Sequence, residues 1–277
     1  MRACRSYPRV LVLAALLLPQ ICEAQSTTPP AIDMTRCQAI AAGDAREHPL
    51  SKVCEFALTY RRSLPDFVCE QTTTSTGPHS IAVLEAEVTF ENGQERYSKV
   101  TTSSKGPKAN SAASAIDFVS AGEFGSDLVN LFKVPTVATF RFRREARLRN
   151  TPSSVYEFHV AAKNNAYWTV RDDRGVTLHP QYEGTLWLER DNEQLLRLAL
   201  RSVDLPQDFG FATVAVTIDY RQVPLTDLGT FDLPSTSTTT ACRRGWGEPD
   251  CTKNVLVFHD CHKFASKGRI LTGPSQH

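Results

Sequence analysis

Alternation of apolar and polar residues runs through most of this chain, and that period restricts the fold more than any other feature. The clearest case is the stretch Tyr182–Leu200. A period of two is typical of a half-buried strand, whereas an amphipathic helix repeats every 3.6 residues. The residues that share the apolar side of this stretch are Tyr182, Leu186, Leu188, Leu196, Leu198 and Leu200. The stretch is therefore predicted to be a β-hairpin with one apolar face.

The same alternation begins at Asp66 and predicts an antiparallel meander. Short turns join successive antiparallel strands, and the alternating strand–helix pattern of a parallel sheet is not visible. The predicted strands are residues 66–74, 81–91, 94–103, 136–149, 153–163, 166–172, 175–179, 182–190, 194–203, 211–223 and 254–264. Four dipeptides typical of tight turns separate several of them: Asn92-Gly93, Asn164-Asn165, Arg174-Gly175 and Asp191-Asn192. The stretch Ser235–Thr240 consists of Ser and Thr and is predicted to be a loop.

Helical spacing is visible in two other places. Two helices are predicted between Ile32 and Leu64, and Pro65 ends the second. A further helix is predicted over residues 115–133, after a Ser-, Lys- and Gly-rich connection that is expected to be flexible. This internal helix either packs permanently on the sheet or moves as a lid over it.

The amino-terminal end has the pattern of a secretory signal. Three Arg precede the apolar run Val10–Leu18, and small side chains at Cys22 and Ala24 suit a signal peptidase. Cleavage is therefore predicted between Ala24 and Gln25. The apolar run is too short to cross a bilayer, which needs about 20 residues, and no second run reaches that length. The mature chain is predicted to lack a transmembrane segment and to reside in the periplasm or outside the cell.

Six cysteines remain after removal of residues 1–24, three of them before residue 70 and three after residue 241. An even set in an oxidising compartment indicates disulfides. If all six pair, an odd number of bridges joins the two groups, so the two ends of the mature chain must be neighbours. Fifteen connectivities are possible. The pairing we expect is Cys37–Cys54, Cys242–Cys251 and Cys69–Cys261, because the first two close short loops.

The charge balance argues against a nucleic-acid partner. The formal net charge is +1, and loss of three Arg and one Glu with the signal changes it to −1. Neither value produces the strong positive field that nucleic acid requires. The arginines of residues 141–149 are accordingly predicted to lie on a solvated face.

No sequence motif of a hydrolase, nucleotide-binding or zinc-peptidase site is present. The cluster His259-Asp260-Cys261-His262 has the residue types of a zinc site or a thiol nucleophile, but disulfide formation by Cys261 is the simpler account. The carboxylate pairs Asp172-Asp173 and Glu183/Glu189 resemble glycosidase pairs only in composition, since they fit a turn and a solvated strand face. The chain is predicted to be non-enzymatic, with no metal and no cofactor.

The hairpin resembles a known family. Tyr182–Glu189, an acidic turn and Gln194–Leu198 are similar to the central hairpin of the LolA/LolB/RseB superfamily of periplasmic lipoprotein carriers. The matching positions are Gly184, Trp187, Asp191 and Arg197. The resemblance is good over residues 182–200 and loose over residues 50–225. It implies an incomplete β-barrel, closed by helices, that holds acyl chains in its hollow.

The predicted fold class is thus mainly β (α+β): an antiparallel meander forming an incomplete barrel, with N-terminal helices and one internal helix packed on it. Residues 1–24 are the signal peptide. Residues 25–65 carry the tail and the N-terminal helices. Residues 66–277 form the half-barrel, including the helix at 115–133, and belong to one domain with 25–65.

Two functions remain open. In the first, the apolar face binds a lipid, an acyl chain (a lipoprotein acyl chain included) or another apolar ligand. In the second, the same face is a dry core, and the chain is a disulfide-stapled cell-envelope domain that binds a protein partner. A pocket of a few hundred Å³ lined by aliphatic side chains would distinguish them. The predicted ligand-binding residues are Phe118, Phe124, Leu128, Phe132, Leu186, Leu188, Leu196, Leu198, Val214 and Val216.

Overall fold

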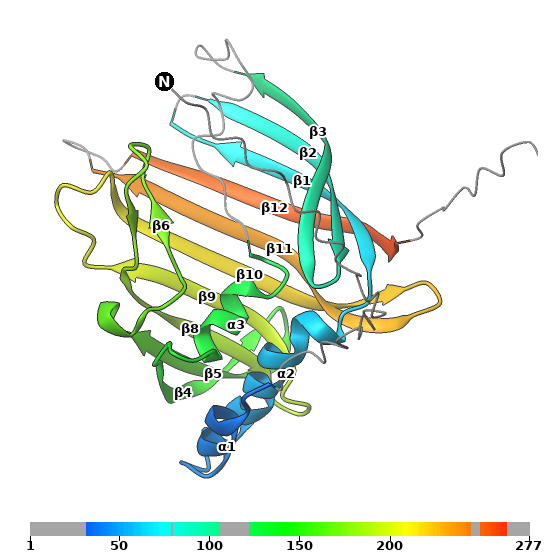
Figure 1. The fold of residues 1–277 in the computed structure, drawn as a ribbon, viewed down its shortest axis with the longest axis vertical. Helices are drawn as coiled ribbons and strands as arrows, with labels where there is room; N and C mark the ends of the chain where they lie inside the picture. Colours follow the sequence, from blue (N-terminus) through cyan, green and yellow to red (C-terminus); the bar gives the residue numbers. More distant parts are fainter. Residues whose placement is uncertain (1–31, 79, 106–121, 245–249, 265–277) are drawn as a thin grey trace, which may run out of the picture. The chain divides into compact units, whose positions relative to one another are not determined.

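Most of the described chain forms one ten-stranded antiparallel sheet that does not close on itself (Figure 1). The computed structural model describes residues 32–264, except residues 79, 106–121 and 245–249. The predicted signal peptide and Phe118 lie outside these residues. Within them three α-helices pack on the sheet, so the predicted fold class is confirmed. The domain bounds stay a prediction.

The strand order joins the two ends of the chain. The order in the sheet is β3-β2-β1-β12-β11-β10-β9-β8-β5-β4, so the first strand pairs with the last. A separate two-stranded hairpin consists of β6 and β7. The strands are β1 (Phe67–Thr76), β2 (Ile81–Glu91), β3 (Gln94–Lys105), β4 (Thr139–Leu148), β5 (Thr151–Val160), β6 (Val170–Arg171), β7 (Thr177–Leu178), β8 (Gln181–Glu189), β9 (Leu195–Val203), β10 (Phe211–Leu225), β11 (Gly229–Arg243) and β12 (Asp250–Lys263).

Two predicted segments differ in the structure. The predicted loop Ser235–Thr240 lies inside strand β11, which runs antiparallel between β10 and β12. Ser and Thr occupy both faces of this strand, so no hydrophobic alternation marks it, although threonine suits strands well. The predicted strand 166–172 is reduced to β6, because a short 3-10 helix at Ala162–Asn164 and an irregular turn occupy the chain before it.

The three α-helices are α1 (Thr35–Ala41), α2 (Pro49–Ser63) and α3 (Ser126–Phe132). Their buried side chains share two hydrophobic clusters with one side of the large sheet, which we call the inner face. In Figure 1 α3 is drawn over the region of β8 and β9. The predicted helix 115–133 begins only at Ser126. Gly122 and Gly125, at φ 112° and 107°, break any earlier helical run, and residues 115–121 are not described.

The hairpin of β8 and β9 contains a β-bulge that the alternation did not predict. Trp187 pairs with Arg197, whereas Leu188 pairs with Leu195, so Leu196 is the extra residue. As a result Leu195 is 4% exposed and enters the core, and Leu196 is only half-buried. The prediction that Leu196 continues the apolar face is therefore wrong.

The structure joins the three expected cysteine pairs. Cys37–Cys54 ties α1 to α2, and Cys242–Cys251 closes the turn between β11 and β12. Cys69–Cys261 links β1 to β12 across 192 residues of sequence. The long bridge thus lies across the strand pair in which the two ends of the chain meet.

Gly125 fixes the start of α3 against α2. A Cβ atom at this position would lie 2.4 Å from the ring atom Cδ1 of Tyr60, a distance that no packed side chain tolerates. The adjacent Phe124 is fully buried, and its ring centroid is 5.5 Å from that of Phe67 and 4.8 Å from that of Phe258. The entry of α3 is therefore held by contacts with both α2 and the sheet.

We predict that loss of the long disulfide destabilises the fold more than loss of a short one. In the loop-entropy model, closing 192 residues contributes about 5 kcal/mol, and closing 9 residues contributes about 2.6 kcal/mol. The double variant Cys69→Ala/Cys261→Ala should lose about twice the free energy of unfolding lost by Cys242→Ala/Cys251→Ala. Urea denaturation under oxidising conditions measures both, and equal losses would contradict the chain-end role of the long bridge.

We also predict that Gly125→Ala weakens the docking of α3 by about 2 kcal/mol or more, because left-handed backbone strain adds to the contact with Tyr60. Gly229→Ala is the matched control. Gly229 also has a positive φ, 110°, but no atom lies within 4 Å of an added Cβ. Chemical denaturation of the two variants separates the cost of backbone strain from the cost of the contact with Tyr60. Equal destabilisation would show that the packing of Gly125 on Tyr60 contributes nothing.

Candidate functional site

The inner face under the helices is apolar along β5, β8, β9 and β10. The structure brings seven of the predicted ligand-binding residues into one buried cluster, each at most 5% exposed. These seven are Leu128, Phe132, Leu186, Leu188, Leu198, Val214 and Val216. Phe124 is buried in the second cluster, beneath β1, β2 and β12. The predicted residues on α3 and on the sheet therefore do face each other, as a packed interface.

Gly184 has a packing role in this interface. On the inner face it lies between Phe158 of β5 and Leu200 of β9. A Cβ atom there would be 2.5 Å from the Phe158 ring and 2.0 Å from the carbonyl oxygen of Ala199. The glycine of the hairpin pattern thus makes room for an aromatic ring on the sheet.

Carboxylates are buried where the segment before α3 meets the sheet. Glu123 is 1% exposed, and Ser237 Oγ of β11 donates a hydrogen bond to Glu123 Oε1 at 3.4 Å. Asp127, in the first turn of α3, has a pKa raised well above its usual value by burial, then by Glu123 and by Glu95 of β3. Burial and Glu123 likewise raise the pKa of Glu95, although Arg61 opposes this. The first turn of α3 therefore places Asp127 in surroundings that disfavour its charged form.

The inner face along β1, β11 and β12 also has a polar part, beside the second hydrophobic cluster. Gln71 and Thr73 lie on β1, and the Gln71 amide donates to Thr73 Oγ1 at 2.9 Å. The side-chain oxygens of Ser75, Thr239 and Thr252 are buried without a hydrogen-bond partner among the described residues. The buried polar residues of this strip are Gln71, Thr73, Ser75, Ser237, Thr239, Thr252 and Asn254. We call them the polar strip. Sequence reasoning missed it, although the alternating Ser and Thr of β1 and β11 are its signal.

Three cavities are described, and none of them is lined by a predicted ligand-binding residue. The largest, about 720 Å³, lies on the outer face between β4 and β10, over Thr185, Ala199 and Thr217. A second, about 310 Å³, lies between α2 and the β8–β9 turn and reaches the side chains of Val53, Phe56 and Leu195. A third, about 300 Å³, lies on the outer face of β1, β2 and β3. The second reaches the core beneath the helices at Val53 and Leu195.

The outer face is covered by charge pairs. Arg197 donates to Asp219 at 2.6 Å, and Arg141 donates to Glu157 at 2.7 Å. Arg144 lies over the ring of Trp187, 5.8 Å from its centroid. The arginines of β4 are thus neutralised or stacked, as expected for a solvated face.

The predicted turn role of Asp172 agrees with its contacts. Burial opposes ionisation of this carboxyl, but hydrogen bonds from Arg174 and from the backbone N–H groups of Val176 and Gly210 lower its pKa. Glu183, the other candidate acid, pairs with Arg201. Both carboxylates hold the local structure together. Cys261 is bonded to Cys69 and has no thiol to offer to zinc or to a substrate.

Among the described residues, no helix combines the length and the apolar character that crossing a membrane requires.

Comparisons with known proteins give likenesses in fold. No protein-family model and no curated protein matches the chain. A LolA superfamily protein of Nitrosomonas europaea is 13% identical at a TM-score of 0.39, over 77% of this chain and 93% of that one. A DUF1329 family protein of Desulfovibrio piger is 11% identical at a TM-score of 0.38, over 80% of this chain and 95% of that one. The MucA/MucB complex of Pseudomonas aeruginosa gives 11% identity and a TM-score of 0.18, over 75% of this chain and 93% of that one. The first likeness names the superfamily that the hairpin resembles.

Proposed function

We propose that this protein is exported and binds an apolar ligand, such as an acyl chain or a lipid, without catalysis, on the inner face after α3 moves away. The observation that carries the proposal is a conflict within the interface. The helix that covers the aliphatic residues of the sheet also carries Asp127, a half-buried carboxyl whose pKa is raised by burial and by the nearby Glu123 and Glu95. We infer that apolar contacts hold α3 over the site and that the acidic group weakens this attachment enough for a ligand to displace the helix.

The apolar side of α3 supplies the closing force. Leu128, Leu131 and Phe132 are each at most 1% exposed, and burial of one such side chain stabilises by about 1.5–3 kcal/mol. The helix has only seven residues and is too short to be stable in isolation. Its structure therefore depends on the sheet, and an apolar ligand that replaces its three side chains would release it.

The acidic groups oppose closure. Charge on Asp127 is disfavoured by burial and by the nearby Glu123 and Glu95. A displaced α3 would return Asp127 to water, which favours its charged form. This gain offsets part of the apolar burial that is lost on opening.

The sheet beneath α3 suits an extended apolar chain. Leu186 pairs with Leu198, and Leu198 pairs with Ile218, so these aliphatic side chains form a row across β8, β9 and β10. The cavity of about 310 Å³ beside α2 reaches this cluster at Leu195. Lys52 and Glu193 form an ion pair at its rim, 2.5 Å apart. We propose this rim as the point of entry.

A second candidate is the dry-core interaction domain, and one observation favours it. The seven predicted ligand-binding residues of the buried cluster are each at most 5% exposed. None of them lines one of the three cavities. In that case α3 is a permanent part of the core, and a protein partner binds elsewhere on the surface.

Asp127→Asn separates the two candidates. We predict that this near-isosteric, uncharged change raises Tm at pH 7.5 by about 2–4 °C, which corresponds to about 1 kcal/mol in a domain of this size. Under the carrier proposal it also weakens uptake of a fatty acid severalfold, because the closed state is favoured. Native mass spectrometry of the oxidised, detergent-free mature protein with added palmitate measures uptake. Asp227→Asn, at an exposed turn, is the control and should change neither property.

Absence of uptake by the wild-type chain, together with an absence of lipid mass in the purified protein, would contradict the carrier proposal. A gain in Tm without any change in uptake would separate stability from lid movement. That result would show that α3 stays in place when the ligand binds.

The raised pKa of Asp127 also predicts the pH dependence of stability. From about pH 3.8 up to its folded pKa, the folded protein retains a proton that the unfolded chain has released. The folded state binds more protons, so the contribution of this group to the free energy of unfolding falls as pH rises through that window. The difference in free energy of unfolding between Asp127→Asn and the wild type should grow from pH 4 to pH 8. Denaturation at several pH values measures it, and a constant difference would contradict the burial of this charge.

A further inference from the structure

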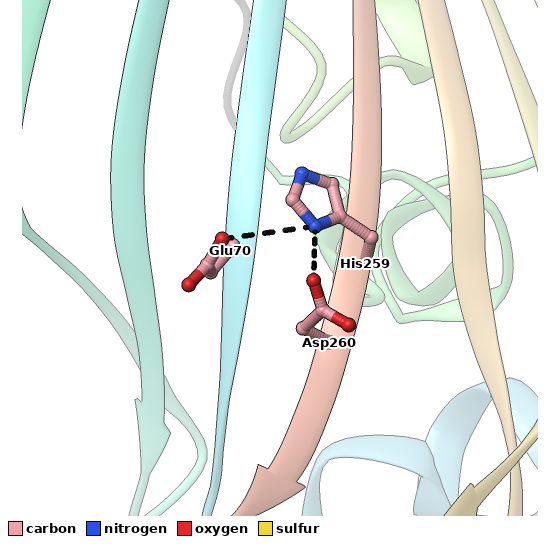
Figure 2. A group of neighbouring side chains, drawn as sticks. All are labelled: Glu70, His259 and Asp260. Atoms are coloured by element: carbon pink, nitrogen blue, oxygen red, sulfur yellow. Dashed lines mark hydrogen bonds and ion pairs between the residues drawn. The ribbon is translucent and has the colours of Figure 1, made fainter.

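We propose that Glu70, His259 and Asp260 form a binding site for a first-row divalent transition-metal ion of the zinc class, on the outer face at the junction of β1 and β12. In Figure 2 the ring of His259 and the carboxylate of Asp260 lie between the two strands, and dashed lines join this ring to Asp260 and to the carboxylate of Glu70 at β1. One ligand atom from each lies within 4.8 Å of the others. The inference is independent of the ligand proposed for the inner face.

The distances suit a small cation. His259 Nδ1 is 2.8 Å from Asp260 Oδ2 and 3.8 Å from Glu70 Oε2. Ligand atoms at 2.0–2.1 Å from a tetrahedral zinc ion lie about 3.3 Å apart, between these two values. All three side chains are at least partly exposed, so a small rotation brings each into place without moving the backbone. Water would complete the coordination.

A β-bulge makes this arrangement possible. Successive residues of a regular strand point to opposite faces of the sheet. Here Val68 pairs with His262, whereas Glu70 pairs with His259, so β12 carries an extra residue. Asp260 has a φ of 50°, in the left-handed region, and its carboxylate lies on the side of the His259 ring. The side chains of two consecutive residues thereby face Glu70 together.

Thr72 holds the imidazole in a useful orientation. Its Oγ1 is 3.3 Å from His259 Nε2, on the far side of the ring from the two carboxylates. With a metal on Nδ1, the Nε2–H group would donate to this hydroxyl, which fixes the tautomer. Cys69, next to Glu70, and Cys261, next to Asp260, form a disulfide. This bond fixes both strands at the site.

The surroundings favour a cation. Glu70 lies directly opposite Glu87 of β2, and like charges in such a pair destabilise a sheet. Glu87 is already engaged by Lys99 at 2.6 Å and by Ser98 at 3.1 Å. The charged and titratable groups that face or adjoin the site are Glu70, Glu85, Glu87, Lys99, Asp260 and His262. Acidic groups predominate, so a divalent ion would reduce the repulsion between them.

The nitrogen ligand selects the class of metal. Imidazole suits zinc, copper and nickel, whereas calcium and magnesium prefer oxygen ligands alone. Thr72, His259 and Asp260 also have the order of a hydroxyl–imidazole–carboxylate triad. Acyl transfer further requires donors for an oxyanion. Since β1 pairs with both β2 and β12 around Thr72, its backbone N–H groups there are used by the sheet. The geometry therefore favours a metal over a nucleophile.

The test is zinc binding by the untagged, oxidised mature chain, stripped with EDTA and titrated with ZnCl₂ at pH 7.5 in a calorimeter. We expect one site that is lost or weakened about 10-fold or more in His259→Asn, and similarly in Glu70→Gln and Asp260→Asn. His179→Asn removes another exposed histidine and should bind as the wild type does. Zinc bound elsewhere is common to all variants and cancels in the comparison.

Three further readouts distinguish a built site from a surface histidine. Zinc should raise the Tm of the wild type but not that of His259→Asn, because it joins β1 to β12 only in the folded state. Affinity should fall from pH 7.5 to pH 5.5, since a proton competes for Nδ1. Calcium in tenfold excess should not displace zinc. Equal zinc uptake and equal Tm shifts in the wild type and His259→Asn would overturn the proposal, as would ester hydrolysis that Thr72→Val abolishes without any zinc binding.

Discussion

The pairing of β1 with β12 is the constraint on which the rest of the structure depends. These strands lie about 190 residues apart in sequence, and the entropy of closing so long a loop opposes their contact. The Cys69–Cys261 bridge removes much of that cost by restricting the unfolded chain. Once the pair forms, β1 to β3 extend the sheet beyond β12, and the inner face acquires its polar part. The same junction places Glu70 beside His259.

The inner face contains two opposed environments. Aliphatic and aromatic side chains along β5 to β10 favour tight packing of the helices, as burial of apolar area always does. The polar strip and the carboxylates of Glu123 and Asp127 lie in the same interior, where burial disfavours charge and leaves some hydroxyls without partners. A chain selected for stability alone would replace these groups by apolar ones. The proposal that α3 opens rests on the presence of Asp127 in this helix of seven residues.

The outer face of the sheet differs from the inner face in carrying charged side chains. Its charges are mostly paired across neighbouring strands, as in Arg197 with Asp219 and Glu183 with Arg201. Such pairs stabilise little, but they keep the exposed side of the sheet polar. Glu70, Glu87 and Asp260 depart from that balance, because like charges gather there. The two proposed sites thus lie on opposite faces, and the metal site depends directly on the strands that the long disulfide joins.

The sequence by itself determined the strand period, the two N-terminal helices, the antiparallel order and the neighbourhood of the chain ends, because these follow from local alternation, turn residues and cysteine parity. It also placed Leu186, Leu188, Leu198, Val214 and Val216 on one face. It failed at Leu196, where a bulge shifts the register, and at Ser235–Thr240, where hydroxyl residues on both faces hide a strand.

Only the tertiary structure decided what surrounds each face. The pKa of Asp127 depends on its burial and on Glu95 of β3, which no local pattern connects to α3. Whether Asp260 joins His259 depends on a bulge opposite β1. Glu95 is distant in sequence from Asp127, and β1 is distant from β12, whereas alternation along one strand carries no information about which strand lies beside it.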